Sequence, residues 1–442
     1  MIELKFSIYF NKFQNDQTDF TFETGINIIY GESGVGKSFF INSLLKNQKS
    51  DEHNFFLKIN SELLDSYLIT QNPDNQIICR TITSELAFNG ECLLKKPSEL
   101  EKIVKNGIKE FPQKINPYMN PGFLSGGEKE FLNIVTATQL DKKMLLIDDG
   151  LSFLSSENKV KVVHLLNKWV EKTGGIVIWI TSDIEDLQTK FIKKWVLDLK
   201  SFNGYIKGET KTHEPLICPQ GDLDLAIENL TFKYENSREI FSKFSLNIEH
   251  ARCLGLLGNN GSGKTTFAGL CFGDLIPIKG SVKLSILRKE NIKIGYLDQF
   301  PENLILLDTV DQFLLKLKTL NLFELEYEDT FKKRLLRFGI VWDKIKNLVG
   351  IEMPWIMLRV TLVVMLTHCS FEVLILDEPS FGLGWNQRVL LRSFLKESMI
   401  NKHFIIVSHD KIFAQSICDK IIDFDNLDFS EKTIGIRKEI KT

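Results

Sequence analysis

An internal repeat is the feature that most constrains this chain of 442 residues. The segment GESGVGKS begins at Gly31 and the segment GNNGSGKT begins at Gly258, so these two glycine-rich segments lie 227 residues apart. Further short blocks recur in the same order at nearly the same spacing, and they contain Gln71 and Gln299, Asp148 and Asp377, and Ser182 and His409. A recurring order of blocks at one spacing indicates two copies of one domain in tandem.

The boundary between the two copies is predicted around residues 208–222. This segment, GETKTHEPLICPQGD, is polar and contains two prolines and two glycines, a composition typical of a linker. We therefore expect a first domain at 1–207, a linker at 208–222 and a second domain at 223–442.

Both glycine-rich segments fit the pattern G-x-x-x-x-G-K-[ST], and each follows a short apolar run and precedes a helix-like stretch. Glycines let backbone N–H groups turn towards phosphate oxygens, and the start of a helix favours an anion. The lysine would reach the phosphates, and the next hydroxyl would face Mg²⁺. A glycine-rich turn with no ligand is the alternative, but two copies in register favour nucleotide binding. The candidate residues are Gly31, Gly34, Gly36, Lys37 and Ser38, and Gly258, Gly261, Gly263, Lys264, Thr265 and Thr266.

Continuous apolar runs predict the core of each copy. KMLLID, GGIVIWIT, EVLILD and HFIIVS are typical of strands that are buried on both faces of a parallel sheet. The predicted fold class is α/β, with two P-loop NTPase cassettes in tandem, each built on a mainly parallel sheet.

Acidic residues end two of these runs. Asp148 and Asp377 could each hold Mg²⁺. Glu378 is placed to orient and deprotonate an attacking water, and His409 could contact the terminal phosphate, although a histidine at a strand end is usually structural. The expected catalytic residues are Glu378, His409 and Gln299. The expected metal-binding residues are Ser38, Gln71, Asp148, Thr265, Gln299 and Asp377.

The segment FLSGGEKE at 123–130, together with the glycine-rich loops, the glutamine blocks and SHD, resembles the ATP-binding-cassette (ABC) ATPase family. The resemblance covers nearly the whole chain. It implies ATP and Mg²⁺ as cofactors, a helical signature subdomain in each cassette, and an intramolecular cassette dimer with two ATP molecules held head to tail between the P-loop of one cassette and the signature of the other. Ser125, Gly126 and Gly127 would bind phosphate there, and a simple helix cap is the alternative.

Two tyrosines resemble the aromatic residue on which the family stacks adenine. Tyr234 lies 24 residues before Gly258, and Tyr9 lies 22 residues before Gly31. Either tyrosine could instead be a core aromatic.

A narrower resemblance points to the energy-coupling-factor (ECF) transporter ATPases. It rests on QNPDNQI at 71–77, TSELAF at 83–88 and DQFPENLI at 298–305. In those pairs the segment after the glutamine faces a membrane partner. The resemblance implies a transmembrane coupling protein and a substrate-binding membrane subunit as partners, import of a micronutrient, and a peripheral location on the cytoplasmic face of the membrane. The apolar stretch 355–368 is too short to span a bilayer and contains Arg359.

Both halves depart from the family pattern. In the first half, Asp149 stands where the family has the catalytic glutamate and Ser182 stands where it has the switch histidine. In the second half, residues 353–357, MPWIM, replace the signature, and they are expected to form an apolar packing helix because proline has no N–H and tryptophan is bulky. Ser155 and Gly384 replace the usual aspartate of the segment after the acidic strand end.

The head-to-tail arrangement would collect the three main departures in one nucleotide site. We expect this first site to bind ATP but to hydrolyse it very slowly, while the second site, with Glu378 and His409, turns over. A misplacement of about 1 Å can cost on the order of 100-fold in rate.

Three other classes of function are alternatives to an ECF-type importer. Soluble tandem ABC proteins that act on ribosomes usually have a long charged linker and two intact sites, and chromosome or DNA-repair ATPases have long coiled coils. A membrane domain fused to the ATPase would favour the prediction of an ABC exporter. The net charge of -2 gives no electrostatic case for nucleic acid binding.

Overall fold

The computed structural model describes residues 2–10, 17–32, 34–46, 55–111, 115–190, 192–205, 218–234, 239–259, 261–287, 291–305 and 307–427. The chain divides into two compact units. The first comprises 1–209 with 382–386, and the second comprises 210–381 with 387–442. Residues 208–217 of the expected linker lie outside the described residues.

A six-stranded sheet is the centre of the first unit, in the order β5-β6-β7-β3-β8-β9. All neighbours are parallel except β8 and β9. Its strands are β3 (Gly25–Tyr30), β5 (Ser66–Ile69), β6 (Met144–Asp148), β7 (Ile176–Thr181), β8 (Lys193–Asp198) and β9 (Ser201–Gly204). The parallel arrangement explains why β6 and β7 are continuous apolar runs, since both faces of such a sheet are covered.

The two faces of this sheet pack against different elements. Along β6, Leu145 and Ile147 belong to one apolar cluster, and Met144 and Leu146 belong to another. Successive side chains of a strand point to opposite faces, so each face receives alternate residues. The first cluster includes residues of the helix that begins in the LSGGE segment. The second cluster includes residues of the helix that follows the glycine-rich loop.

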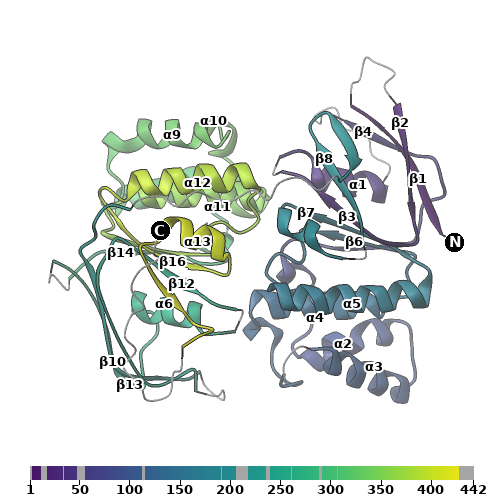
Figure 1. The fold of residues 1–442 in the computed structure, drawn as a ribbon, viewed down its shortest axis with the longest axis horizontal. Coiled ribbons are helices and arrows are strands. Elements are labelled where there is room, and N and C mark those ends of the chain that lie inside the picture. The colour runs from purple at the N-terminus through teal and green to yellow at the C-terminus, as the bar shows by residue number, and fades with distance from the viewer. Residues whose placement is uncertain are drawn as a thin grey trace. The chain divides into compact units, whose positions relative to one another are not determined.

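The helices of the first unit lie on both sides of the sheet, with α1 on one side and α4 and α5 on the other (Figure 1). A small antiparallel sheet, in the order β2-β1-β4, covers α1. These remaining elements are β1 (Glu3–Tyr9), β2 (Gln17–Glu23), α1 (Lys37–Lys46), β4 (Phe56–Ile59), η1 (Pro73–Gln76), α2 (Ile82–Cys92), α3 (Pro97–Glu110), η2 (Pro121–Phe123), α4 (Gly126–Thr138), α5 (Ser156–Thr173) and η3 (Ile184–Gln188).

The second unit repeats this plan with a parallel sheet in the order β14-β15-β16-β12-β17 and an antiparallel sheet in the order β11-β10-β13. The strands are β10 (Leu223–Phe232), β11 (Phe241–Ala251), β12 (Cys253–Leu257), β13 (Lys279–Ile286), β14 (Ile294–Leu297), β15 (Val373–Asp377), β16 (His403–Ser408) and β17 (Lys420–Asp423). Alternate residues of β15 and β16, such as Ile375 and Ile405, share a core with the antiparallel sheet.

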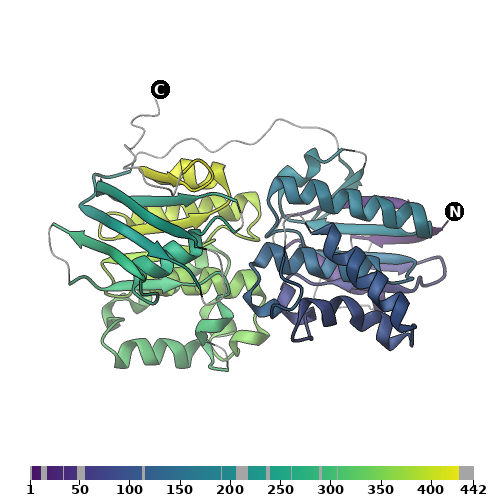
Figure 2. The same ribbon diagram turned by 90° about the horizontal axis from the view of Figure 1, so that it is seen from below.

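The second unit has helices on both sides of its parallel sheet: α6 shares an apolar core with β10 and β13, and α9, α11 and α12 lie on the other side (Figures 1 and 2). Its helices are α6 (Lys264–Phe272), α7 (Glu302–Ile305), α8 (Val310–Thr319), η4 (Leu325–Tyr327), α9 (Glu328–Arg337), α10 (Trp342–Ile345), η5 (Gly350–Glu352), α11 (Trp355–Thr367), α12 (Trp385–Ser398) and α13 (Lys411–Ile417). Helix α11 begins at Trp355 and is buried from Leu358 to Thr367, so the apolar packing helix expected at residues 353–357 is confirmed from Trp355 onwards, whereas Met353 and Pro354 precede the helix.

The strand order of the two units confirms the predicted fold class. β5-β6-β7-β3-β8 in the first unit corresponds to β14-β15-β16-β12-β17 in the second. The antiparallel sheets were not predicted, because strands such as β1 and β10 mix buried residues with exposed or half-buried ones and lack the continuous apolar runs of the parallel strands.

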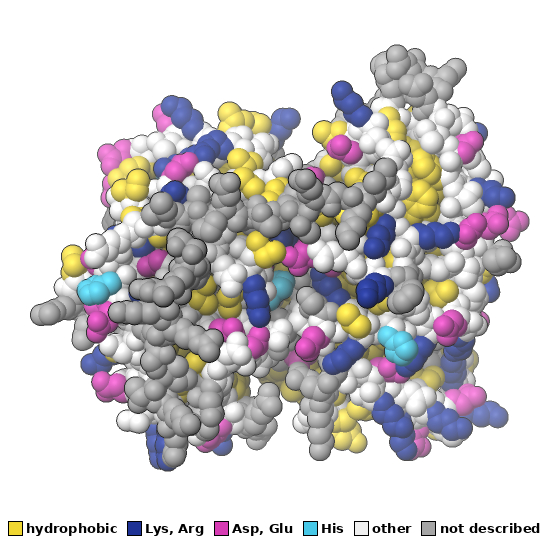
Figure 3. Space-filling view, in the orientation of Figure 1, with side chains coloured by type: hydrophobic (Ala, Val, Ile, Leu, Met, Phe, Trp, Pro, Cys, Tyr) yellow, Lys and Arg dark blue, Asp and Glu magenta, His cyan; other side chains and the backbone are white. Residues whose placement is uncertain are grey.

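Two properties of the surface bear on function. No helix in the described ranges is both long enough and apolar enough to cross a membrane. Figure 3 shows Lys and Arg side chains interspersed with Asp and Glu side chains over the face in view. Such mixing of signs matches the small net charge and gives no extended field of one sign on this face.

The buried His368, at the end of α11, should make stability depend on pH. Its Nδ1 lies 2.7 Å from the Val364 carbonyl oxygen, and burial lowers its pKa from 6.5 to about 4. As pH falls from about 6.5 to about 4, only the unfolded chain gains this proton, so the free energy of unfolding should drop by roughly 2–3 kcal/mol. Urea unfolding at pH 7.0 and pH 5.0 measures the difference.

The variant His368→Gln should flatten this pH dependence because glutamine has no proton to gain. The exposed His164→Gln is the matched control and should leave the slope unchanged. An equal slope in the wild type and in His368→Gln would contradict the assignment.

Candidate functional site

The glycine-rich loop of the first unit joins the end of β3 to the start of α1. Gly34 and Gly36 have φ angles of 89° and 100°, a region that favours glycine. Lys37 begins α1 and is buried, and its Nζ donates to the carbonyl oxygen of Glu32 at 3.2 Å. Nζ also lies 4.0 Å from Asp149 Oδ2. Ser33 lies outside the described residues.

The loop of the second unit has the same placement between β12 and α6. Gly258, Gly261 and Gly263 have positive φ angles of 152°, 75° and 98°. Lys264 Nζ donates to the carbonyl oxygens of Gly258 at 2.7 Å and Asn259 at 2.9 Å. Burial lowers the pKa of Lys264 although carboxylates lie nearby. A buried ammonium beside a helix start is suited to an anion such as a phosphate.

A hydroxyl and a buried carboxyl meet at each loop. Thr265 Oγ1 donates to Asp377 Oδ2 at 2.9 Å. Burial, and then the neighbouring Glu378, raise the pKa of Asp377 to about 7. In the first unit, burial and Asp149 raise the pKa of Asp148 to about 6, and a hydrogen bond with Ser38 opposes the rise.

These hydroxyl and carboxyl oxygens fit magnesium. A carboxyl group that is costly to ionise favours a nearby cation, and Mg²⁺ prefers oxygen ligands, usually one or two carboxylates with phosphates and waters. The described part of the chain holds no cluster of three His, Cys, Asp or Glu side chains that could form a metal site from protein groups alone. One hydroxyl and one carboxyl group at each loop fit a metal whose other ligands are phosphate and water oxygens.

The residues after the two acidic strand ends share an unusual backbone conformation. Asp149 and Glu378 have φ angles of 49° and 51°, in the left-handed region that non-glycine residues seldom adopt. The Asp149 N–H donates to Ile180 O at 3.0 Å, and the Glu378 N–H donates to Val407 O at 2.9 Å. Each carboxyl group is thereby turned towards the end of the neighbouring strand, and matched strain of this kind is typical of functional positions.

The partners of these two carboxyl groups differ between the units. Glu378 Oε1 accepts hydrogen bonds from the His409 N–H and lies 2.9 Å from His409 Nδ1. Burial opposes ionisation of Glu378, but His409, followed by Lys264 and Arg359, lowers the pKa of the carboxyl group overall. Burial also opposes charge on His409, yet Glu378 raises its pKa. Glu378 is thus held in the ionised form that a general base needs.

In the first unit, Ser182 takes the place of the histidine. Its N–H and hydroxyl donate to Asp149 Oδ1 at 2.8 Å and 3.1 Å. Burial raises the pKa of Asp149 in spite of Lys37 and these bonds. The first unit therefore presents a shorter and less readily ionised carboxyl group.

The LSGGE segment begins α4, as the sequence predicted. Ser125 is its N-cap, and the Ser125 N–H and hydroxyl both donate to Glu128 Oε2 at 2.8 Å. This is a capping box, so within the first unit the local arrangement is that of a helix cap whose first turn includes the buried Gly126 and Gly127. In the second unit Pro354 is the N-cap of α11 and makes no side-chain hydrogen bond as a cap.

The glutamine segments adjoin these helices. Gln71 precedes η1, and its amide nitrogen is buried without a hydrogen-bond partner among the described residues. Helix α4 holds η1 directly, because Lys129 Nζ lies 2.8 Å from Asp74 Oδ1 and Asn133 Nδ2 donates to Pro73 O at 3.0 Å.

In the second unit, the Gln299 carbonyl oxygen accepts a hydrogen bond from Arg359, a residue whose role the motif analysis did not foresee.

The two candidate adenine-stacking tyrosines have different surroundings. Tyr234 is 45% exposed, and its hydroxyl lies 3.1 Å from Thr266 Oγ1 on the loop's helix. Tyr9 stacks on Phe56 with ring centroids 4.3 Å apart. Tyr234 is thus directly tied to the glycine-rich loop's helix, whereas one face of Tyr9 is already covered.

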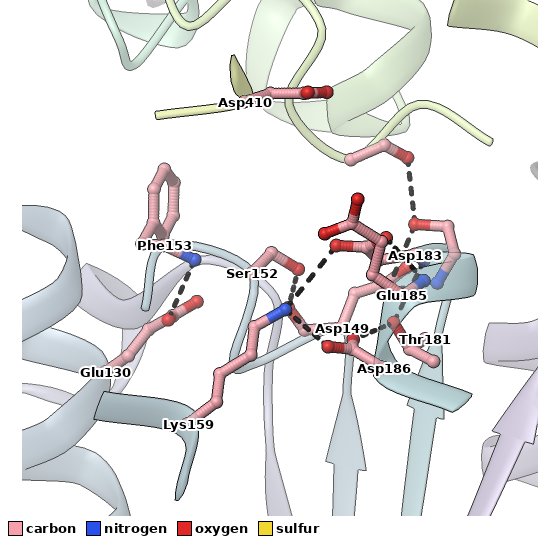
Figure 4. A network of polar contacts seen from close by, with 12 residues as sticks. Glu130, Asp149, Ser152, Phe153, Lys159, Thr181, Asp183, Glu185, Asp186 and Asp410 are labelled. Carbon is pink, nitrogen blue, oxygen red and sulfur yellow. Dashed lines mark hydrogen bonds and ion pairs between the residues drawn. The ribbon is translucent and has the colours of Figure 1, made fainter. Parts of the chain in front are cut away.

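A buried ionic network behind Asp149 was also missed (Figure 4). Lys159 Nζ lies 2.5 Å from Asp186 Oδ1 and 3.5 Å from Asp183 Oδ2, and Thr181 Oγ1 donates to Asp186 at 2.6 Å. Burial raises the pKa of Asp186 to about 6. The network fixes the segment that follows Ser182.

The second unit has a simpler counterpart of this network, because Arg388 lies 3.0 Å from Asp410, the residue after His409. Lys159 and Arg388 are each the fourth residue of their helix, α5 or α12. Asp183 and Asp410 each follow the switch position in their unit. Because both positions recur in the two halves, the sequence repeat could have predicted this ion pair.

Comparison with known proteins agrees with this geometry. The family model described as ABC transporter matches residues 16–152 and 241–381, one match in each unit. The chain belongs to this family. ABC transporter ATPase domains thus occur twice in tandem, and the family implies ATP binding and hydrolysis.

Relatives that match over most of this chain and most of their own length support the tandem arrangement. A protein of Vibrio vulnificus strain CMCP6, named "Putative ABC transporter ATP-binding protein", is 22% identical, with 87% of this chain and 80% of that protein covered. A protein of Streptococcus agalactiae with the same description is 24% identical over 90% of this chain and 84% of its own. Two solved structures share the fold over most of this chain. A chain of "Model of ribosome-bound archaeal Pelota and ABCE1" has a TM-score of 0.65 at 16% sequence identity, covering 91% of this chain and 72% of that one. The structure "RNase-L Inhibitor" has a TM-score of 0.54 at 17% identity, with 91% and 83% covered.

Replacement of the capping serine in the first ABC unit should destabilise α4. Ser125→Ala removes the hydroxyl of the capping box and should cost about 0.5–2 kcal/mol in the free energy of unfolding. Ser125→Thr retains a hydroxyl and is the control. Denaturant unfolding of the three proteins measures the loss, and equal midpoints for Ser125→Ala and wild type would contradict the capping role.

Proposed function

We propose that the second unit hydrolyses ATP and that the first unit binds ATP but hydrolyses it very slowly. The observation that carries this proposal is the pair Glu378–His409 beside the Lys264 loop, which the first unit replaces by Asp149 and Ser182. The family supplies the reaction, and the difference between the two units supplies the division of labour.

In the proposed reaction, Lys264 and the backbone N–H groups of the glycine-rich loop bind the phosphates. Glu378 accepts a proton from water as the water oxygen bonds to the terminal phosphorus and the bond from that phosphorus to the bridging oxygen breaks, giving ADP and phosphate. His409 holds the Glu378 carboxylate and keeps it ionised. Thr265 and Asp377 would hold Mg²⁺, which neutralises charge on the phosphates when bound.

The same steps are impaired in the first unit for three physical reasons. Asp149 is one methylene shorter than glutamate, its pKa is raised by burial, and Ser182 cannot supply the charge of a histidine. Loss of a general base costs about 10²–10⁴-fold in rate. Binding of ATP depends on the loop with Lys37 and on Ser38 and Asp148, which the first unit retains. The signature residues Ser125, Gly126 and Gly127 would complete the second unit's site if the cassettes pair head to tail, as the family resemblance implies.

The cellular role that we propose is the ATPase subunit of a membrane transporter, of the ECF type that imports a micronutrient. The names of the relatives, which describe ABC transporter ATP-binding proteins, support a transporter. The segments after Gln71 and Gln299 carry the narrower ECF proposal. The partners would be an integral coupling protein and a substrate-binding membrane subunit, and the chain would lie at the cytoplasmic face of the membrane.

A tandem ABC protein that acts on ribosomes is the second candidate. We name this candidate because the fold is similar to that of a chain from a ribosome-bound complex. At 16% sequence identity, this similarity concerns the fold alone.

Replacement of the two carboxyl groups should separate the units' roles. Glu378→Gln should reduce ATPase activity by about 10²-fold or more because the general base is lost. Asp149→Asn should change the rate by less than about twofold, since that site contributes little turnover. Steady-state phosphate release measures both, and comparable losses from the two variants would refute the division of labour.

Purification of the tagged full chain from its native cells should identify the partner class. We expect it to co-purify with integral membrane proteins from detergent-solubilised membranes. Sedimentation with ribosomes, stable to high salt, together with no membrane partner, would favour the second candidate instead.

A further inference from the structure

The signature helices of the two units carry opposite kinds of side chain at one matched, buried position. Helix α4 begins at Gly126 and α11 begins at Trp355, and each has 13 residues. The fifth residue is Glu130 in α4 and Arg359 in α11, and the side chains are 1% and 0% exposed. Neither residue belongs to the phosphate loops or the acidic strand ends.

Arg359 joins two parts of the second unit's site. Its Nη1 donates to the carbonyl oxygen of Glu378, and its Nη2 donates to the carbonyl oxygen of Gln299. One planar guanidinium group therefore holds the backbone of the water-orienting carboxylate residue and the backbone of the glutamine segment together. The two residues are far apart in sequence and lie at the ends of neighbouring parallel strands β15 and β14.

Aromatic rings enclose the same guanidinium group. Its central carbon lies 4.0 Å from the ring centroid of Trp355 and 5.5 Å from that of Phe381. The two rings are themselves packed edge to face at 5.0 Å. Trp355 stands in the segment that replaces the family signature, so the bulky residue that makes this segment unsuited to phosphate covers Arg359 instead.

A buried guanidinium group is costly, and its retention needs compensation from hydrogen bonds and ring contacts. The bond to the Glu378 carbonyl also acts at a residue whose φ is 51°, a conformation that persists only where surrounding contacts hold it. Arg359 is well placed to hold that strained backbone, and with it the direction of the Glu378 carboxyl group.

Glu130 makes a different contact in the first unit. Its Oε2 accepts a hydrogen bond from the Phe153 N–H at 2.9 Å, in the loop that follows β6 (Figure 4). The first unit thus uses an acceptor where the second uses a cationic donor.

We propose that Arg359 is a positioning residue for ATP hydrolysis, fixing the backbone of Glu378 relative to that of Gln299 under the cover of Trp355. This inference rests on the proposed function of the second unit. It means that the altered signature segment of the second unit serves that unit's own hydrolytic site.

The test compares Arg359→Met and Arg359→Lys in the full chain. Methionine keeps an apolar stem but donates to neither carbonyl, so kcat should fall about 10–100-fold, as expected for a misplacement approaching 1 Å. The KM for ATP and the Kd of a fluorescent ATP analogue should stay within about twofold, because Lys264 and Thr265 are untouched. Lysine can bond one carbonyl and should restore part of the rate.

Glu130→Gln is the matched control at the corresponding position of α4. Burial raises the pKa of Glu130 well above its usual value, and glutamine keeps the size of the side chain and an oxygen acceptor for the Phe153 N–H. Its kcat should lie within about twofold of the wild type.

Melting temperature and the amount of ATP analogue bound per chain separate positioning from folding. A rate loss in Arg359→Met that merely follows a loss of folded, nucleotide-binding protein, or an unchanged kcat in a well-folded variant, would overturn the proposal. If Arg359→Met does not fold, Arg359→Lys decides: a wild-type kcat overturns the proposal, and a reduced kcat with unchanged nucleotide Kd supports it. If Glu378→Gln retains full activity, the proposed function fails. Loss of activity in Glu378→Gln with full activity in Arg359→Met refutes this inference alone.

Discussion

The site of each unit depends on carboxyl groups buried at the end of a central parallel strand. A parallel sheet covered on both faces offers such groups no water, so their charge must be balanced by whatever the loops and neighbouring strands bring to the same edge. In both units that edge receives a lysine and a hydroxyl from the glycine-rich loop. Burial and a neighbouring carboxyl group raise the pKa values of Asp148 and Asp377, and a cation at this edge would oppose that rise.

The two units show how one backbone frame supports different chemistry. Asp149 and Glu378 share a left-handed backbone and the same hydrogen bond to the neighbouring strand. The difference lies in what faces the carboxyl group, a serine in one unit and a histidine in the other, and in the residue at the fifth position of the signature helix. The first unit therefore retains the backbone arrangement, the glycine-rich loop and Asp148. It lacks a histidine that would keep the carboxyl group of a general base ionised.

The sequence predicted the features that short local patterns encode. The glycine-rich loops, the buried strands β6, β7, β15 and β16, and the helix that LSGGE begins follow from glycine placement and apolar runs. The antiparallel sheets were not foreseen, since their strands mix buried residues with exposed or half-buried ones and lack the continuous apolar runs of the parallel strands. From the sequence, Arg359 is only a charge in an apolar stretch. Its partners are backbone carbonyl oxygens that the sheet brings close together, and no side-chain motif in the sequence predicts such contacts.

The attachment of η1 to α4 has a mechanical consequence for the first unit. Lys129 and Asn133, on one side of α4, hold Asp74 and Pro73 of the turn after Gln71. The Lys129 side chain is buried and that of Asp74 is exposed, and their ion pair acts together with the hydrogen bond from Asn133 to the Pro73 carbonyl oxygen, so the turn and the helix should move together. A force applied to the surface of that turn would therefore tilt α4. The tilt would displace Ser125 at the start of the helix, so movement of η1 and movement of the first residues of α4 are coupled.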